Sequence, residues 1–266
     1  MTRPVPTRAS TPVLMYHHVE PAPLSPPARH PDSYVTPAAL ARHLHRLGAW
    51  GLRPVTLGAA GVAWAAGRRL RRTVVLTFDD ACACFAAHAL PELALRGAAA
   101  TVFAVSGELG GSNAWDADQG ERRERLMSAV ELRFLIERGI EVGSHGRRHL
   151  DLTQAGEAAL TDEVAGSRRD LEAALGRPVG TFCYPYGRAS AAARRAVREA
   201  GYGAAVAIHD HPGAVPGDPW AVPRLPVRPG EGRLELWLKA TGLYPAWSRL
   251  PRLGLLAALR GREAGP

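Results

Sequence analysis

The stretch VVLTFDDACACF, residues 74–85, runs from an apolar, β-favouring segment directly into two adjacent aspartates, Asp79 and Asp80. The five residues before the carboxylates are suited to a buried strand. Two neighbouring carboxylates repel each other, and a carboxylate beside a core is costly unless a positive charge compensates it. The stretch therefore predicts that another part of the chain supplies such a charge.

Short apolar segments recur along the chain, as expected for strands that are buried on both faces of a parallel sheet. Amphipathic helical patterns lie between them, and several carry a capping residue at the start or a glycine at the end. This alternation predicts an α/β fold with a parallel sheet, as a barrel or partial barrel. The predicted strands are 12–17, 73–78, 100–105, 140–144, 180–184 and 203–208, and the predicted helices are 36–51, 128–139, 152–176 and 190–201.

Length and composition fit one large domain. The 266 residues, of which 46% are hydrophobic, suit a single α/β barrel. The net charge is +8, but the basic residues are dispersed and no nucleic-acid-binding motif is present, so we expect no nucleic-acid partner. Attraction to an anionic membrane surface or a phosphate-bearing substrate is the alternative interpretation of this charge.

The three cysteines predict no disulfide framework, because their number is odd and small. Cys82 and Cys84 form a CxC pair that no second pair completes into a zinc site. We interpret them, with Cys183, as small buried thiols in a reducing compartment.

The ends of the chain set the expected domain limits and location. Residues 1–11 are expected to form an arm, 12–230 the domain, and 231–266 a helical tail that packs on the domain or lies at a membrane face. No apolar segment resembles a signal peptide or spans a bilayer, so we expect a cytoplasmic protein, with peripheral contact with the inner membrane face as an alternative.

Polar residues follow three of the predicted strands at the same end. Asp79 and Asp80 follow 73–78, the sequence SHGRRH follows 140–144, and YPYG follows 180–184. In α/β barrels the chemistry lies at the carboxyl ends of the strands, so these groups are expected to meet there.

His145 and His149 are spaced to share a metal ion. If their segment forms a helical turn, a separation of four places both rings on one face. Two histidines and one carboxylate make a facial triad with open positions for water and substrate. A divalent metal would supply the positive charge that the aspartate pair requires. One aspartate would bind the metal, and the other would take a proton from a water whose pKa the metal lowers towards ~7.

The motifs TFDD, SHxxxH and YPYG, in this order, resemble those of the polysaccharide deacetylase family (NodB homology, carbohydrate esterase 4). The opening PVLMYHHV resembles the branch of poly-β-1,6-N-acetylglucosamine de-N-acetylases. The resemblance covers roughly residues 12–230. It implies a (β/α)7-type distorted barrel and a metal-dependent hydrolase that removes N-acetyl groups from a glycan or its lipid-linked precursor. Zinc is the expected metal, with nickel or cobalt as alternatives.

The resemblance also implies roles for single residues. Asp79 would be the general base, and Asp80 would bind the metal with His145 and His149. The backbone N–H of Tyr186 would stabilise the oxyanion. The expected substrate contacts are Tyr184, Pro185, Gly187 and Arg224, the last of which has a structural role as its alternative.

Three departures from the family pattern stand out. Ala81 replaces the glycine that usually follows TFDD, and Cys183 stands where an arginine often orients the catalytic aspartate. The late Leu-x-His motif that provides the general acid is not evident. His17 or His18, at the end of strand 12–17, is the candidate acid, and we select His17. His209 and His211 are expected to have a loop role.

The sequence leaves three competing functions open. The first is a catalytically impaired glycan-binding protein on the same fold, and the second is an O-acetyl esterase. The third is a 2-His-1-carboxylate iron oxygenase, whose usual sandwich-like fold disagrees with the α/β pattern. The presence of both aspartates and both histidines disfavours the first.

Overall fold

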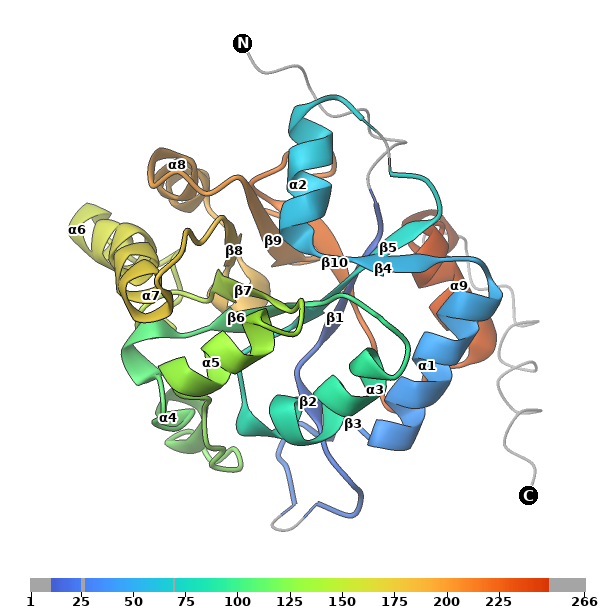
Figure 1. Ribbon diagram of the computed structural model, residues 1–266. Helices are drawn as coiled ribbons and strands as arrows, with labels where there is room; N and C mark the ends of the chain where they lie inside the picture. The colour runs from blue at the N-terminus through green and yellow to red at the C-terminus, as the bar shows by residue number, and fades with distance from the viewer. Residues whose placement is uncertain (1–10, 25–26, 69, 249–266) are drawn as a thin grey trace.

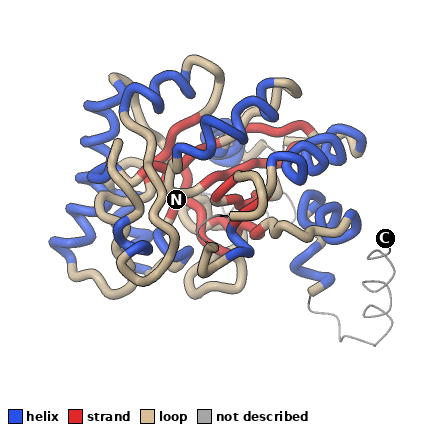
Figure 2. The backbone as a smooth tube through the Cα atoms, turned by 90° about the horizontal axis from the view of Figure 1, so that it is seen from below, coloured by secondary structure: helices blue, strands red, loops and turns tan. Residues whose placement is uncertain are grey.

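The computed structural model of the protein describes residues 11–24, 27–68 and 70–248 (Figure 1). Strands gather in the middle and helices surround them (Figure 2). The strands are β1 (Val13–Tyr16), β2 (His18–Val19), β3 (Tyr34–Val35), β4 (Arg53–Val55), β5 (Thr73–Phe78), β6 (Thr101–Ala104), β7 (Glu141–Ser144), β8 (Thr181–Cys183), β9 (Ala204–Ile208) and β10 (Val222–Pro226). The α-helices are α1 (Pro37–Ala49), α2 (Leu57–Ala65), α3 (Leu90–Ala94), α4 (Ala114–Ala117), α5 (Ala129–Ile136), α6 (Glu157–Thr161), α7 (Ser167–Leu175), α8 (Ala191–Glu199), α9 (Arg233–Thr241) and α10 (Tyr244–Trp247).

The main sheet closes into a barrel of seven parallel strands. Its order is β1-β10-β9-β8-β7-β6-β5, and β5 pairs back to β1 through Val75↔Val13 and the three residues that follow. Strand β4 lies outside this ring, beside the first half of β5. The predicted (β/α)7-type distorted barrel is therefore confirmed.

Alternation along the strands separates the barrel interior from the helix-covered exterior. Val75, Phe103 and Val206 belong to a cluster that also contains Leu57 and Trp64 of α2. The neighbouring strand residues belong to the larger cluster that the surrounding helices cover. Helix α2 thus closes the amino end of the barrel, and the carboxyl ends of the strands are left for the functional groups.

The six predicted strands are all confirmed, as are the helices at 36–51, 128–139 and 190–201 apart from their terminal residues. Thr36 caps α1, and Ser128 forms a capping box with Glu131 at α5. The helix predicted at 152–176 begins only at Glu157 and passes through a π-helical turn, Asp162–Gly166. The elements that were not predicted are strands β2, β3, β4 and β10 and helices α2, α3 and α4.

Beyond residue 230 the chain continues with α9, which packs against α1 and β1. Leu236 and Ala240 of α9 are buried in the main core cluster. The rest of the tail, 249–266, and the arm at 1–10 lie outside the described residues. Within the described part of the chain, no helix is long and apolar enough to cross a membrane.

Candidate active site

The functional groups predicted from sequence meet at the carboxyl end of the barrel. Asp79 and Asp80 directly follow β5. Because side chains alternate along a strand, Asp79 points into the barrel, as Val75 and Thr77 do. His145 follows β7, and Arg224 reaches the same space from β10. All four side chains are at least nine-tenths buried. These side chains therefore meet at the strand ends, as the sequence predicts.

Asp80, His145 and His149 form a compact set of potential metal ligands. The Nε2 atom of His145 lies 3.5 Å from Oδ1 of Asp80, and Nε2 of His149 lies 3.8 Å from the same oxygen. One ligand atom from each residue lies within 4.8 Å of the other two. Nδ1 of His145 lies 2.9 Å from the carbonyl oxygen of Cys183, a contact that fixes the ring with Nε2 directed at Asp80.

The polar atoms of this set fit a divalent cation. Asp80 Oδ1 and His149 Nδ1 are buried and have no hydrogen-bond partner. Burial and the neighbouring Asp79 raise the pKa of Asp80 to about 8, so this carboxylate needs a positive charge to stay ionised. Burial lowers the pKa of both histidines, which keeps the rings neutral and able to bind a metal. Nitrogen and carboxylate ligands suit zinc among other divalent ions.

The two histidines do not converge on a helical turn, so that hypothesis is wrong. Their segment is an irregular loop in which Gly146 and His149 both have positive φ. The buried carboxylate of Glu163 holds this loop: its Oε2 accepts the backbone N–H groups of Arg147 and Arg148, each at 3.0 Å. Glu163 lies in the π-helical turn, and no sequence signal marked it.

Both carboxylate oxygens of Asp79 are bound by Arg224. Nη1 of Arg224 donates to Oδ1 and Nη2 donates to Oδ2, both at 2.5 Å. Arg224 has no exposed surface, so its guanidinium lies below the open part of the site, where no substrate would reach it. Burial opposes ionisation of Asp79, but Arg224 outweighs burial and holds the pKa of this carboxyl well below its usual range.

The side chain of Cys183 contacts both Arg224 and Asp79. Its Sγ atom accepts from Nη2 of Arg224 at 2.9 Å and lies 3.7 Å from Oδ1 of Asp79. Burial raises the pKa of this thiol well above its usual value, so it is neutral. Arg224 of β10 thus takes the place of the arginine that the family often has at position 183. The small side chain of Cys183 leaves room for it.

The two N-terminal histidines occupy different environments. Nε2 of His17 lies 3.5 Å from Oδ2 of Asp79, and its side chain is 26% exposed. Burial lowers the pKa of His17 to about 4. His18 is directed away from this site, where its ring stacks on Tyr34 at a centroid distance of 4.3 Å. Of the two candidates, only His17 lies next to Asp79.

The YPYG motif forms a tight turn whose residues differ in exposure. Tyr184 is buried, and its hydroxyl donates to the carbonyl of Trp220 at 2.7 Å. Pro185 and Gly187 are buried as well, and a Cβ at Gly187 would lie 2.3 Å from Ile208. Only Tyr186 is open, at 37% exposure. The side chain of Tyr184 is therefore packed in the core, away from any substrate.

The loops around Tyr186 add contacts that sequence patterns did not indicate. The ring of Tyr186 meets the ring of His149 edge-on at 4.7 Å, and Trp115 of the short helix α4 stacks on His149 at the same distance. Nδ1 of His211 lies 3.0 Å from the carbonyl oxygen of Tyr186, in agreement with a loop role. Two aromatic rings thus pack against His149 and restrict its orientation.

Four residues of this site hold a left-handed backbone without being glycine: Asp80, Ala81, His149 and Tyr186, with φ between 52° and 66°. Such conformations cost of order 1–3 kcal/mol each and persist where the surroundings over-determine them. Ala81 is the position at which the family usually has glycine, so the turn keeps its shape there without one.

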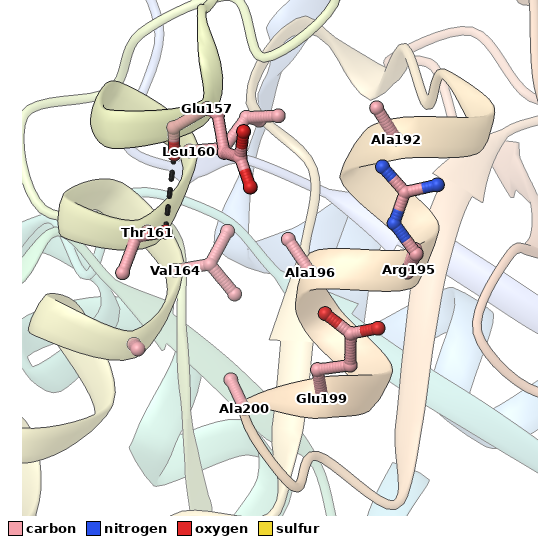
Figure 3. Close-up of a pocket in the computed structure, with 10 residues that line it drawn as sticks. Glu157, Leu160, Thr161, Val164, Ala192, Arg195, Ala196, Glu199 and Ala200 are labelled. Atoms are coloured by element: carbon pink, nitrogen blue, oxygen red, sulfur yellow. Dashed lines mark hydrogen bonds between the residues drawn. The ribbon is translucent and has the colours of Figure 1, made fainter.

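A separate groove of about 230 Å³ lies between α6 and α8 (Figure 3). It shares no residue with the cluster at the strand ends. Alanines and aliphatic side chains form its floor, with Glu157, Arg195 and Glu199 along its edges. We assign it no chemistry.

The protein is a (β/α)7 barrel. At the carboxyl ends of its strands it carries a set of two histidines and one carboxylate, and a second aspartate that is bound by an arginine. The chain belongs to the polysaccharide deacetylase family, whose sequence profile matches residues 66–205, just over half of its length. That region contains both aspartates, both histidines and the YPYG turn, but neither His17 nor Arg224. No curated protein sequence matches the chain.

Solved structures share the fold. The Streptococcus pyogenes deacetylase PplD in complex with acetate is 20% identical, with a TM-score of 0.74, 90% of this chain covered and 99% of that one. IcaB from Ammonifex degensii is 22% identical, with a TM-score of 0.70 and coverages of 89% and 97%. A de-N-acetylase from Aggregatibacter actinomycetemcomitans is 18% identical, with a TM-score of 0.69 and coverages of 86% and 98%.

Proposed function

We propose that this protein is a metal-dependent hydrolase that removes N-acetyl groups from an amino-sugar-containing glycan. The observation that carries the proposal is the division of the aspartate pair. Asp80 faces two neutral histidines with its unpartnered oxygen, whereas both oxygens of Asp79, which also lies within 4.8 Å of His145, are bound by Arg224. The family membership supports an acetylated glycan as substrate, and the acetate-bound and de-N-acetylase structures support loss of an N-acetyl group.

Asp80, His145 and His149 would hold the divalent metal. When bound there, the metal would act as a Lewis acid towards the acetyl carbonyl and the attacking water. Zinc is our first choice, with nickel or cobalt as alternatives, because the ligands are nitrogen and carboxylate oxygen. The backbone N–H of Tyr186 would donate to the developing oxyanion.

Asp79 would accept the proton of the attacking water. Arg224 keeps Asp79 ionised and fixes both carboxylate oxygens, so we propose a positioning role for Arg224 in place of the substrate contact expected from sequence. His17 is neutral at pH 7 because burial lowers its pKa to about 4. Its Nε2 could take the proton from Asp79, 3.5 Å away, and deliver it to the leaving nitrogen.

Acetate release tests the function. Purified protein would be incubated with matched N-acetylated and O-acetylated glycan oligomers, with and without a chelator. We expect release from the N-acetylated members, loss of release with chelator, and recovery on addition of zinc. Release from O-acetyl esters alone would replace the proposal with the esterase. No release from any member, with metal bound, would favour a glycan-binding role.

Arg224→Lys is expected to move the pH dependence of the reaction. A lysine keeps the charge but cannot bind both oxygens of Asp79, so the pKa of Asp79 should rise. Since Asp79 must be ionised to act as base, the acidic limb of kcat/KM should shift to higher pH. The loss of one charge-assisted hydrogen bond, ~1.5–3 kcal/mol, would lower kcat/KM by roughly 10- to 100-fold.

The matched control is Arg195→Lys on the exposed side of α8, which should change neither quantity. A pH profile of Arg224→Lys with its acidic limb unmoved would contradict the positioning role.

A further inference from the structure

A second group of potential metal ligands lies beside the active site, on residues that the deacetylase chemistry does not use. It consists of His18, Cys82 and Cys84, one ligand atom from each lying within 4.8 Å of the other two. Nδ1 of His18 lies 4.0 Å from Sγ of Cys84. All three side chains are buried, and both thiols are free. Two cysteines and a histidine are a ligand set typical of zinc.

Glu124 offers a candidate fourth ligand beside Cys82, with which it forms another group of potential ligands together with Glu20. Oε2 of Glu124, a buried carboxylate, lies 3.8 Å from Sγ of Cys82. The other oxygen of Glu124 is occupied, since it accepts from the Tyr34 hydroxyl at 3.3 Å and pairs with Nε of Arg122 at 3.2 Å. This arrangement fixes the carboxylate with one oxygen directed at Cys82, as the residues that orient metal ligands do.

The surrounding charges favour a dication. Two thiolates would neutralise Zn²⁺, and Arg122 is shared by Glu124 and Glu20, so these two carboxylates keep one negative charge beside the cation. Four ligands of this kind satisfy the tetrahedral, closed coordination of structural zinc, with no open position for water. The site would connect three segments that are distant in sequence: β2, the turn after β5, and the loop that carries Glu124.

We propose that His18, Cys82, Cys84 and Glu124 bind a structural zinc ion, separate from the metal at Asp80. The sequence could not indicate it, because the CxC pair lacks a second pair and its partners lie 64 and 42 residues away along the chain (His18 to Cys82 and Cys82 to Glu124). Its consequence is local: a zinc ion bound to Cys82 fixes the turn two residues after Asp80. The inference does not depend on the substrate of the enzyme.

The test combines metal content with spectroscopy on the full chain. Zinc-loaded wild-type protein should contain one zinc equivalent more than the double variant Cys82→Ser/Cys84→Ser. Asp80→Asn should lose the other equivalent and keep this one. With cobalt in place of zinc, wild-type protein should show thiolate-to-cobalt charge-transfer absorption. The double variant should lack this absorption, and Cys183→Ser should keep it, which excludes a contribution from Cys183.

X-ray absorption at the zinc edge of wild-type protein provides a second measurement that needs no variant and is independent of whether the double variant folds. Sulfur scatterers at ~2.3 Å are expected, and their share should rise in Asp80→Asn. Only nitrogen and oxygen scatterers, an absorption band that depends on Cys183, or a Cys82–Cys84 disulfide in unreduced protein would each overturn the proposal.

Discussion

Asp79→Asn is expected to keep its metal and to lower kcat/KM for acetate release by a factor of about 10²–10⁴, the usual contribution of a general base. The amide has the shape of the carboxylate but cannot accept the water's proton. It also leaves one nitrogen of Arg224 facing an N–H group, so the free energy of unfolding should fall. Acetate release, metal content by mass spectrometry and urea unfolding measure the three quantities.

Two outcomes bear directly on the assignment of Asp79. If Asp79→Asn retained near-full turnover on an N-acetylhexosamine oligomer, Asp79 would not be the base. If the variant lost its metal, Asp79 would be a ligand, and the roles of the two aspartates would have to be exchanged.

Asp80→Asn is expected to fail at an earlier step, the binding of the metal. Asparagine tolerates the left-handed backbone that Asp80 adopts, so the turn should keep its conformation. The loss of the anionic ligand should weaken metal affinity by at least about 100-fold. Removal of a residue that only orients a metal ligand costs up to about this much. Competition with a chromophoric chelator measures the affinity. Activity should be absent at stoichiometric metal and rise when metal is in excess.

The two variants are matched controls for each other. They remove the same charge from neighbouring residues by the same isosteric change, so a general effect on folding or on the field of the site would act on both. Metal content should separate them. Identical metal affinity in both variants would contradict the division of the pair into base and ligand.

Much of the fold could be predicted from the sequence. Closure of seven strands into a barrel buries both faces of most strands, and such strands stand out as continuous apolar runs. Strand β5 reads as a continuous apolar run, and its prediction at 73–78 needs no correction. Strand β10 was missed because prolines and Arg224 interrupt its pattern. Helix α2 was missed because it carries two glycines and packs its apolar residues into the end of the barrel.

The convergence of Asp80, His145 and His149 beside Asp79 could be predicted because the carboxyl ends of the strands in a parallel barrel lie on one side. The partner of Asp79 could not be predicted, since Arg224 is 145 residues away and only the closure of β1 onto β10 and β5 brings the two together. The support of the histidine loop by Glu163 was also invisible, because it depends on the tertiary packing of a helix against that loop. Spacing along a chain does not report such contacts.

The left-handed residues of the active site set a limit on engineering this enzyme. Substitutions that relax Asp80, Ala81, His149 or Tyr186 towards ordinary backbone angles remove strain, so a screen for thermal tolerance selects them. In the proposed mechanism, those same angles direct the Asp80 carboxylate, the histidine loop and the Tyr186 N–H at one point. Gains in heat resistance are therefore better sought on the helix-covered side of the barrel, where side chains can be exchanged without re-aiming the catalytic groups.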